Sequence, residues 1–249
     1  MVVAQIMNTL GIAIVKYVYR SNKSFTAFEA MTSRSLFQVI FNQGIMFCLG
    51  LSYRSIKWED LKKLSIRFSL GYPAWTMIYY SVDSLPVGLS FTIQNLTPFF
   101  TLIFAYVMLK EGLKRLEVYN MGASFLGVLI IVWSSKKVGD GSKQLTELDF
   151  AIGVFLNTLS AILIAIVNVV IRSLKSLHFA VAAGFQAILT FSVSLVVLIF
   201  YRVAINSNFD YTTFTGFEIF LIVLNGLVQC VMQICWIKSL FLDKAGRAS

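Results

Sequence analysis

The sequence is poor in the residues on which most catalytic and metal sites depend. Its 249 residues include one histidine, three cysteines, three prolines and twelve acidic residues. Because His178 is the sole histidine, the sequence lacks nearly all the residues from which a catalytic triad or a histidine-based metal site is built. No G-x-S-x-G turn, no Gly-rich phosphate-binding loop and no pair of carboxylates within an apolar segment is present. We therefore expect no enzymatic activity, no catalytic residues, no bound metal and no cofactor.

Two further absences concern redox state and targeting. Cys48, Cys230 and Cys235 all lie within apolar segments, so no disulfide framework is indicated. The N-terminus has no basic region ahead of its first apolar run and no A-x-A-like cleavage site. Residues 2–19 are therefore interpreted as a first membrane helix rather than a cleaved signal peptide.

Charged residues are also scarce, at 13%, whereas 57% of the residues are hydrophobic and the mean hydropathy is +0.77. A soluble domain of this size could not bury so much apolar surface, so lipid must be the solvent for most of the chain. The net charge of +9 does not indicate nucleic-acid binding, because the basic residues lie mostly in short loops between apolar segments. We expect the lipid bilayer as a partner and no nucleic acid.

The apolar residues form eight segments, most of them long enough to cross a hydrocarbon core of about 30 Å as a helix. They cover residues 2–19, 25–51, 64–82, 87–109, 116–133, 150–171, 179–201 and 214–242. The sequence thus predicts an all-α, polytopic membrane helix bundle with eight transmembrane helices.

Lys and Arg in the loops indicate the orientation of these helices. With a cytosolic N-terminus, twelve basic residues fall in inside loops and six in outside loops. The first helix alone favours the opposite orientation, because its basic residues follow it. We give the whole-chain count more weight and predict a multi-pass protein with a cytosolic N-terminus. The sequence does not distinguish between the plasma membrane and the endomembranes as the location of the protein.

An internal repeat divides the chain. AIVKYVYRSNKS at 13–24 aligns with AIVNVVIRSLKS at 165–176, and the longer stretches 13–34 and 165–186 share nine identities in 22 positions. The offset of 152 residues places the sixth segment on the first, so each repeat has five segments and the second copy enters the membrane from the opposite side. We predict an inverted 5+5 repeat: residues 1–135, a linker at 136–149, and residues 150–249.

The second repeat is expected to be incomplete. The third segment aligns with the eighth at an offset near 158, so the second copy has three segments when the sequence reaches Ser249. Counterparts of the fourth and fifth segments are expected to be missing, either in a truncated product or in a fragment.

The fourth and fifth segments carry a family resemblance. DSLPVGLSFTIQNLTPFFTLIFAYVMLKE, followed by MGASFLGVLIIVW, resembles the first EamA domain of the drug/metabolite transporter superfamily, with Pro98 and Glu111 as its proline and terminal acid. The opening TLGIAIVKYVYRSNKSFTAFEAMTSRSLFQ is similar to the eukaryotic solute-carrier-35 G-type branch, with Lys16 and Arg34 at matching places. The resemblance implies ten helices in two inverted halves that move small solutes; this chain has eight segments.

Basic residues inside the predicted helices are the first candidate binding residues. Lys16 and Arg34 have polar counterparts in the second repeat, Asn168 and Gln186. A cation in a membrane helix usually marks a pathway or a paired site. Snorkelling to the headgroups is the alternative for Lys16, as it is for Lys238 in the eighth segment. The spacing of Glu29 and Arg34 points them to different faces, which favours Lys16 as a partner of Glu29.

Polar residues and prolines at mid-depth form a second set. Gln94, Asn95 and Thr97 either bind solute or bond to neighbouring helices. Gln233 is a further candidate in the eighth segment. Pro98 and Pro73 are predicted hinges or kinks, because proline removes a backbone hydrogen bond of the helix.

The function that these features favour is secondary transport of small organic solutes by alternating access between the repeats. The excess of buried positive charge suggests an anionic metabolite. The alternative is a non-transporting membrane protein, or a fragment, with a partner-binding or regulatory role. Homodimerisation is left open by the sequence.

Overall fold

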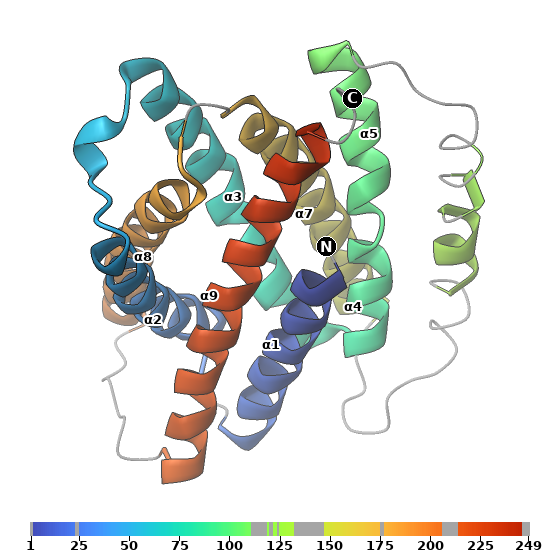
Figure 1. Cartoon of the computed structure of the whole chain (residues 1–249). Helices are drawn as coiled ribbons and strands as arrows, with labels where there is room; N and C mark the ends of the chain where they lie inside the picture. The colour runs from blue at the N-terminus through green and yellow to red at the C-terminus, as the bar shows by residue number, and fades with distance from the viewer. Residues whose placement is uncertain are drawn as a thin grey trace. The chain divides into compact units, whose positions relative to one another are not determined.

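In the computed structural model, residues 2–22, 25–110, 119, 122–123, 125–131, 147–174, 177–205 and 214–245 are described. All regular structure in these ranges is helical (Figure 1). The helices are α1 (Val2–Ser21), α2 (Ala27–Cys48), η1 (Tyr53–Ser55), α3 (Trp58–Ser84), α4 (Val87–Gln94), α5 (Thr97–Leu109), α7 (Glu147–Ser173), α8 (Phe179–Ala204) and α9 (Gly216–Ala245). Helix formation is confirmed for seven of the eight predicted segments. In the remaining segment, 116–133, residues 119, 122–123 and 125–131 are described, and they are helical.

Four helical stretches in the described ranges are long and apolar enough to cross a membrane. They are Val87–Met108, Leu148–Ser173, Phe179–Ala204 and Gly216–Leu240. The chain is therefore a helical membrane protein. The larger number of eight transmembrane helices stays a prediction.

The chain divides into two compact units, one formed by Met1–Phe68 with Leu174–Ser249 and the other by Ser69–Ser173. The first is called unit 1 and the second unit 2. The division passes through α3, whereas the predicted repeat boundary lies at 136–149. A compact unit can combine helices of two repeats, so the predicted domain limits remain a prediction.

Close helix contacts hold unit 1 together. Within it, α2 packs against α8 and α9, and α1 packs against α9. Gly226 of α9 lies so near Phe37 of α2 that an added Cβ would be 2.8 Å from the Phe37 Cγ atom. Gly184 of α8 is similarly close to Met46 and Tyr53, with an added Cβ 2.7 Å from the Met46 Sδ atom. Small residues at these positions let the helices approach closely. Such contacts are common in membrane proteins, because the hydrophobic effect does not drive helices together in lipid.

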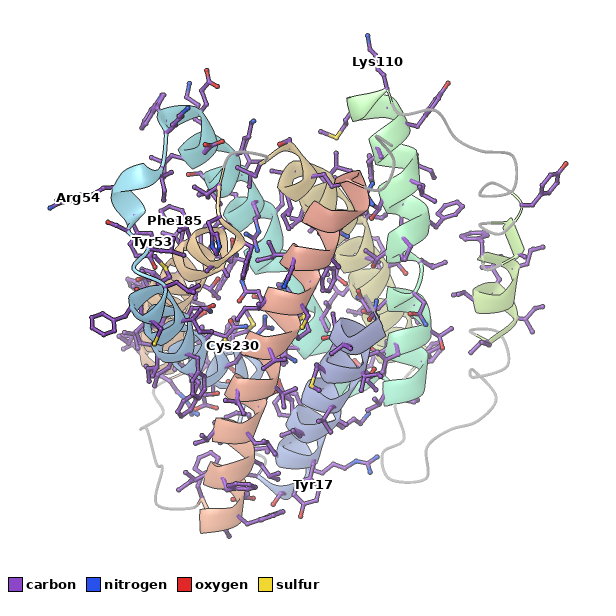
Figure 2. The ribbon with its side chains drawn as sticks, viewed as in Figure 1. Tyr17, Tyr53, Arg54, Lys110, Phe185 and Cys230 are labelled. Atoms are coloured by element: carbon purple, nitrogen blue, oxygen red, sulfur yellow. The ribbon has the colours of Figure 1, made fainter. Side chains whose placement is uncertain are left out.

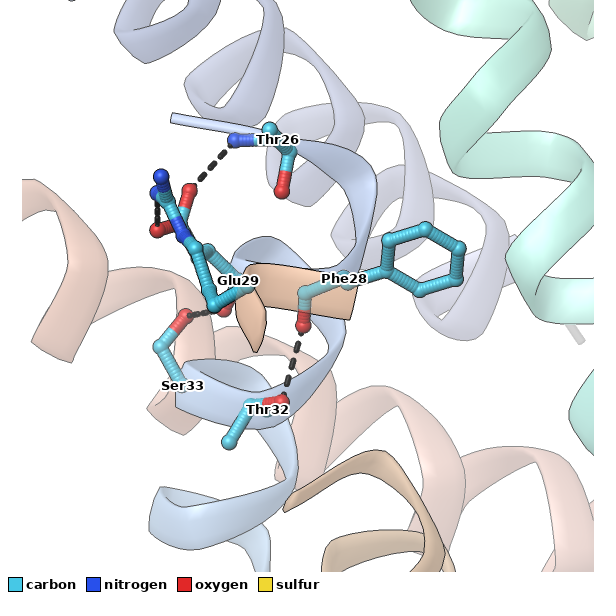
Figure 3. A network of polar contacts seen from close by, with 6 residues as sticks. Thr26, Phe28, Glu29, Thr32 and Ser33 are labelled. Carbon is cyan, nitrogen blue, oxygen red and sulfur yellow. Dashed lines mark hydrogen bonds and ion pairs between the residues drawn. The ribbon is translucent and has the colours of Figure 1, made fainter. Parts of the chain in front are cut away.

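Two helices of unit 1 begin with the same sequence pattern, Thr-x-Phe-Glu. At the start of α2 the carboxylate of Glu29 accepts a hydrogen bond from the Thr26 backbone N–H at 2.6 Å (Figure 3). At the start of α9 the carboxylate of Glu218 accepts one from the Thr215 N–H at 2.8 Å. Each glutamate thus satisfies a backbone donor that the helix itself leaves unpaired.

Unit 2 contains a break within its predicted fourth segment. Helix α4 ends at Gln94 and α5 begins at Thr97, and both pack against α7 (Figure 1). Pro98 lies in the first turn of α5, where it has no N–H to donate to the Gln94 carbonyl. Pro73, in contrast, lies inside the continuous helix α3. A hinge at either proline stays a prediction.

Candidate functional site

A hydrogen-bonded polar seam joins α4 to α7 in unit 2. The Gln94 Nε2 atom donates to the Asn157 Oδ1 atom and to the Ser160 Oγ atom, each at 2.6 Å. The Asn157 Nδ2 atom donates in turn to the Ser90 carbonyl oxygen at 3.0 Å and to the Ser90 Oγ atom at 2.9 Å. Asn157, Ser160 and Ser90 are fully buried. Gln94 is therefore bonded to a neighbouring helix. This is one of the two roles that the sequence analysis left open for it, the other being solute binding.

The seam continues along α5. The Asn168 Nδ2 atom of α7 donates to the Thr101 Oγ1 atom at 3.3 Å, and Thr101 donates to the Thr97 carbonyl oxygen at 2.8 Å. Of the predicted site residues, Gln94, Thr97 and Asn168 are thus brought onto one seam. Asn95 is exposed between the two helices. Asn157 and Ser90 were missed by the sequence interpretation, although both are polar residues inside long apolar runs.

Replacing Asn157 by leucine should destabilise the protein, because Gln94 and Ser90 would lose a buried partner. The expected loss is about 1–3 kcal/mol in the free energy of unfolding. Titration with SDS in mixed micelles, followed by helix circular dichroism, measures it. Thr158→Val is the matched control, because the Thr158 hydroxyl donates to the Val154 carbonyl oxygen of its own helix. A loss for Asn157→Leu no larger than that of the control would contradict a stabilising role for the seam.

In unit 1, buried polar residues recur along α2 and α8. Arg34, Gln38 and Asn42 are buried on α2, and Gln186, Thr190 and Ser194 are buried on α8. Both sets have a spacing of four residues, so each lies along one face of its helix. Gln38 and Asn42 are hydrogen-bonded: the Gln38 Nε2 atom donates to the Gln229 carbonyl oxygen of α9 at 3.2 Å, and the Asn42 Nδ2 atom to the Gln38 carbonyl oxygen at 2.8 Å.

The predicted basic residues differ in burial. The Arg34 residue is only 5% exposed, whereas Lys16 is half-buried and Lys238 is exposed. Gln233, on α9 like Lys238, is half-buried. Arg34 is therefore the deepest of the predicted cations.

Glu29 forms an ion pair with Arg202 of α8. Both side chains are almost completely buried. The sequence interpretation had favoured Lys16 as the partner of Glu29. Arg202 lies one residue beyond the predicted segment 179–201, but α8 continues to Ala204 and so includes it.

Other candidates lie elsewhere. Glu111, the terminal acid of the predicted motif, is outside the described residues. The exposed side chains of Arg54 in η1 and of Lys110, the residue after α5, point away from the neighbouring ribbon (Figure 2). Within the described ranges, no group of three or more His, Cys, Asp or Glu residues is placed to hold a metal ion.

Comparisons with known proteins find relatives that are described as transporters. Two uncharacterised transporters from two strains of Helicobacter pylori are each 23% identical to it over 125 residues, which make up 50% of this chain and 39% of each relative. The match therefore spans well under half the length of these relatives. No family model matches the chain.

A solved crystal structure shares the fold. The two chains superpose with a TM-score of 0.64 at 15% sequence identity, over 94% of this chain and 79% of the other. At this identity the likeness concerns the fold alone. Together with its apolar helices, the comparisons make the chain a helical membrane protein similar to uncharacterised transporters.

Proposed function

We propose that this protein is a secondary transporter of small organic solutes, working by alternating access between two inverted repeats. The proposal includes eight transmembrane helices, a cytosolic N-terminus and a place in the drug/metabolite transporter superfamily. It is supported by the similarity to uncharacterised transporters and by the EamA-like residues around Pro98.

The observation that carries the proposal is the correspondence of buried polar positions in the two repeats. At the offset of 152 residues, Arg34, Gln38 and Asn42 of α2 fall on Gln186, Thr190 and Ser194 of α8, and all six are buried. The three positions are matched at one constant offset, which supports a common origin of the two helices. Repeats that share a polar face are expected where a substrate site lies at the repeat interface.

The proposed solute is an anionic metabolite. Arg34 is a buried arginine on α2, and its guanidinium group is suited to bind a carboxylate through two parallel hydrogen bonds. The residues proposed to bind the solute are those that the sequence singled out. They are Lys16, Arg34, Gln94, Asn95, Thr97, Asn168, Gln186, Gln233 and Lys238.

Counterflow in proteoliposomes tests the proposal. Vesicles that contain the purified chain are preloaded with unlabelled succinate, lactate or sorbitol, and uptake of the same labelled compound is followed. We expect saturable uptake of a carboxylate and none of sorbitol, relative to protein-free vesicles. Uptake of sorbitol alone would contradict the anionic class but leave transport in place. Absence of saturable uptake of all three would contradict the proposal as a whole.

A further inference from the structure

Helices α1 and α9 run antiparallel in unit 1, and their contacts fix which residues lie level with each other. At one end Ser21 donates a hydrogen bond to the carboxylate of Glu218. Further along, Gly11 meets Asn225 and Gln229, and a Cβ at Gly11 would be 3.0 Å from the Asn225 Oδ1 atom. The side-chain amide of Gln229 is closer still to the Gly11 position. The contact therefore places two amides of α9 directly against the backbone of α1.

Four amide side chains lie on the stretches of α1 and α9 that adjoin this contact. Asn225, Gln229 and Gln233 are four residues apart along one face of α9. Asn8 lies one turn before Gly11 on the same face of α1, and the antiparallel direction brings it level with Gln229 and Gln233. Asn8, Asn225 and Gln229 are 6%, 3% and 0% exposed. This group is called the amide cluster.

The amide cluster is rich in acceptors that the protein does not satisfy. The Oδ1 atoms of Asn8 and Asn225 and the Oε1 atoms of Gln229 and Gln233 are buried and have no hydrogen-bond partner in the described part of the chain. Of the amide nitrogens of the cluster, only the Gln229 Nε2 atom is likewise buried and without a hydrogen-bond partner in the described residues. Buried polar groups in a membrane protein are normally paired, because hydrocarbon offers no substitute for water. Four unpaired oxygens against one nitrogen favour a positively charged or donor-rich ligand.

The chemistry of the oxygens narrows the ligand further. Amide carbonyl oxygens coordinate hard cations, and rings of neutral carbonyls replace the hydration shell of monovalent ions in membrane proteins. The cluster itself contains no carboxylate, and divalent sites usually depend on carboxylates to balance the charge. A single positive charge is therefore the better match.

We propose that Asn8, Asn225, Gln229 and Gln233 form a binding site for a small monovalent cation, either Na⁺ or an ammonium group. The site lies between α1 and α9, and Gln38 of α2 supports it by its bond to the Gln229 backbone. Cation binding stands independently of transport. A role of the cation as coupling ion rests on the proposed function.

Thermal unfolding of the purified full-length chain in a neutral detergent tests the site. The reference buffer contains choline chloride, and NaCl, KCl or methylammonium chloride replaces it at constant ionic strength. The midpoint should rise by about 5–10 °C when the cation concentration is about a hundred times its dissociation constant. A rise with Na⁺ but not with methylammonium assigns an inorganic ion, and the reverse assigns an ammonium group.

Variants on two helices connect the shift to the amide cluster. Gln229→Leu and Asn8→Leu should each abolish the cation-dependent rise. Neither should lower the midpoint in choline, because the Gln229 amide and the Asn8 Oδ1 atom have no hydrogen-bond partner in the described residues. Gln94→Leu is the matched control, a mid-depth glutamine whose amide is hydrogen-bonded. It should lower the midpoint in every salt and keep the full cation-dependent rise.

Two results would overturn the proposal: a wild-type midpoint that no cation raises, or a cation-dependent rise that survives in both Gln229→Leu and Asn8→Leu. These results are distinct from failure of the transporter proposal. Cation binding is measured in detergent, where no transport takes place. A lack of counterflow would therefore not contradict the cation site, and a lack of a midpoint shift would not contradict transport.

Discussion

Arg202→Met should lower the free energy of unfolding by about 3–5 kcal/mol, because it leaves the carboxylate of Glu29 buried without its counter-charge. The bond from the Thr26 N–H satisfies one carboxylate oxygen, and Arg202 pairs with the other. Since both side chains of the pair are almost completely buried, solvent cannot take over the role of the arginine. SDS titration of the purified chain in mixed micelles measures the loss.

The double variant separates an unpaired charge from lost packing. Glu29→Gln combined with Arg202→Met removes both charges and should recover most of the stability that Arg202→Met alone loses. Arg54→Met is the matched control: Arg54 is exposed, so its replacement should change the free energy of unfolding by less than about 0.5 kcal/mol. A loss for Arg202→Met as small as that of the control would mean that the pair contributes no more than a screened surface ion pair.

The positions of the helices could be predicted from the sequence because each is a long apolar run between short polar connections. In the hydrocarbon core no water can form hydrogen bonds with the backbone. An apolar run of this length therefore forms a helix, in which the backbone groups bond to one another. The interruption near Pro98 was also predictable, since proline removes one backbone donor whatever its neighbours are. These features depend on local residues and need no knowledge of packing.

The partners of the polar residues could not be predicted in the same way. Glu29 and Arg202 are 173 residues apart, and nothing near Glu29 in the sequence indicates that α8 passes beside it. Gln94 and Gln229 look alike in sequence, as glutamines in the middle of apolar segments. The structure gives Gln94 two side-chain acceptors on α7 and leaves the Gln229 amide with none in the described residues. Only the packing of neighbouring helices decides which amide has protein partners and which has none in the described residues.

Arg34→Gln should reduce carboxylate uptake in proteoliposomes by about 10–100-fold. A charge-assisted hydrogen bond contributes about 1.5–3 kcal/mol, and every 1.4 kcal/mol changes a binding constant tenfold. Glutamine is also the residue at the corresponding position of the proposed second repeat, Gln186, so the replacement is compatible with a buried helix position. The measurement is the initial rate of labelled succinate or lactate counterflow at equal amounts of reconstituted protein.

Two further variants distinguish the charge of Arg34 from its shape and from a general effect of losing an arginine. Arg34→Lys keeps the charge but not the planar fork of donors, so uptake should be intermediate if the anion is held by two parallel hydrogen bonds. Arg54→Gln removes an exposed arginine and should leave uptake unchanged. Carboxylate uptake by Arg34→Gln equal to that of the wild type would contradict a solute-binding role for Arg34. Its burial on α2 would then have to be explained by structure alone, because a cation at that depth is too costly to be kept without a compensating partner.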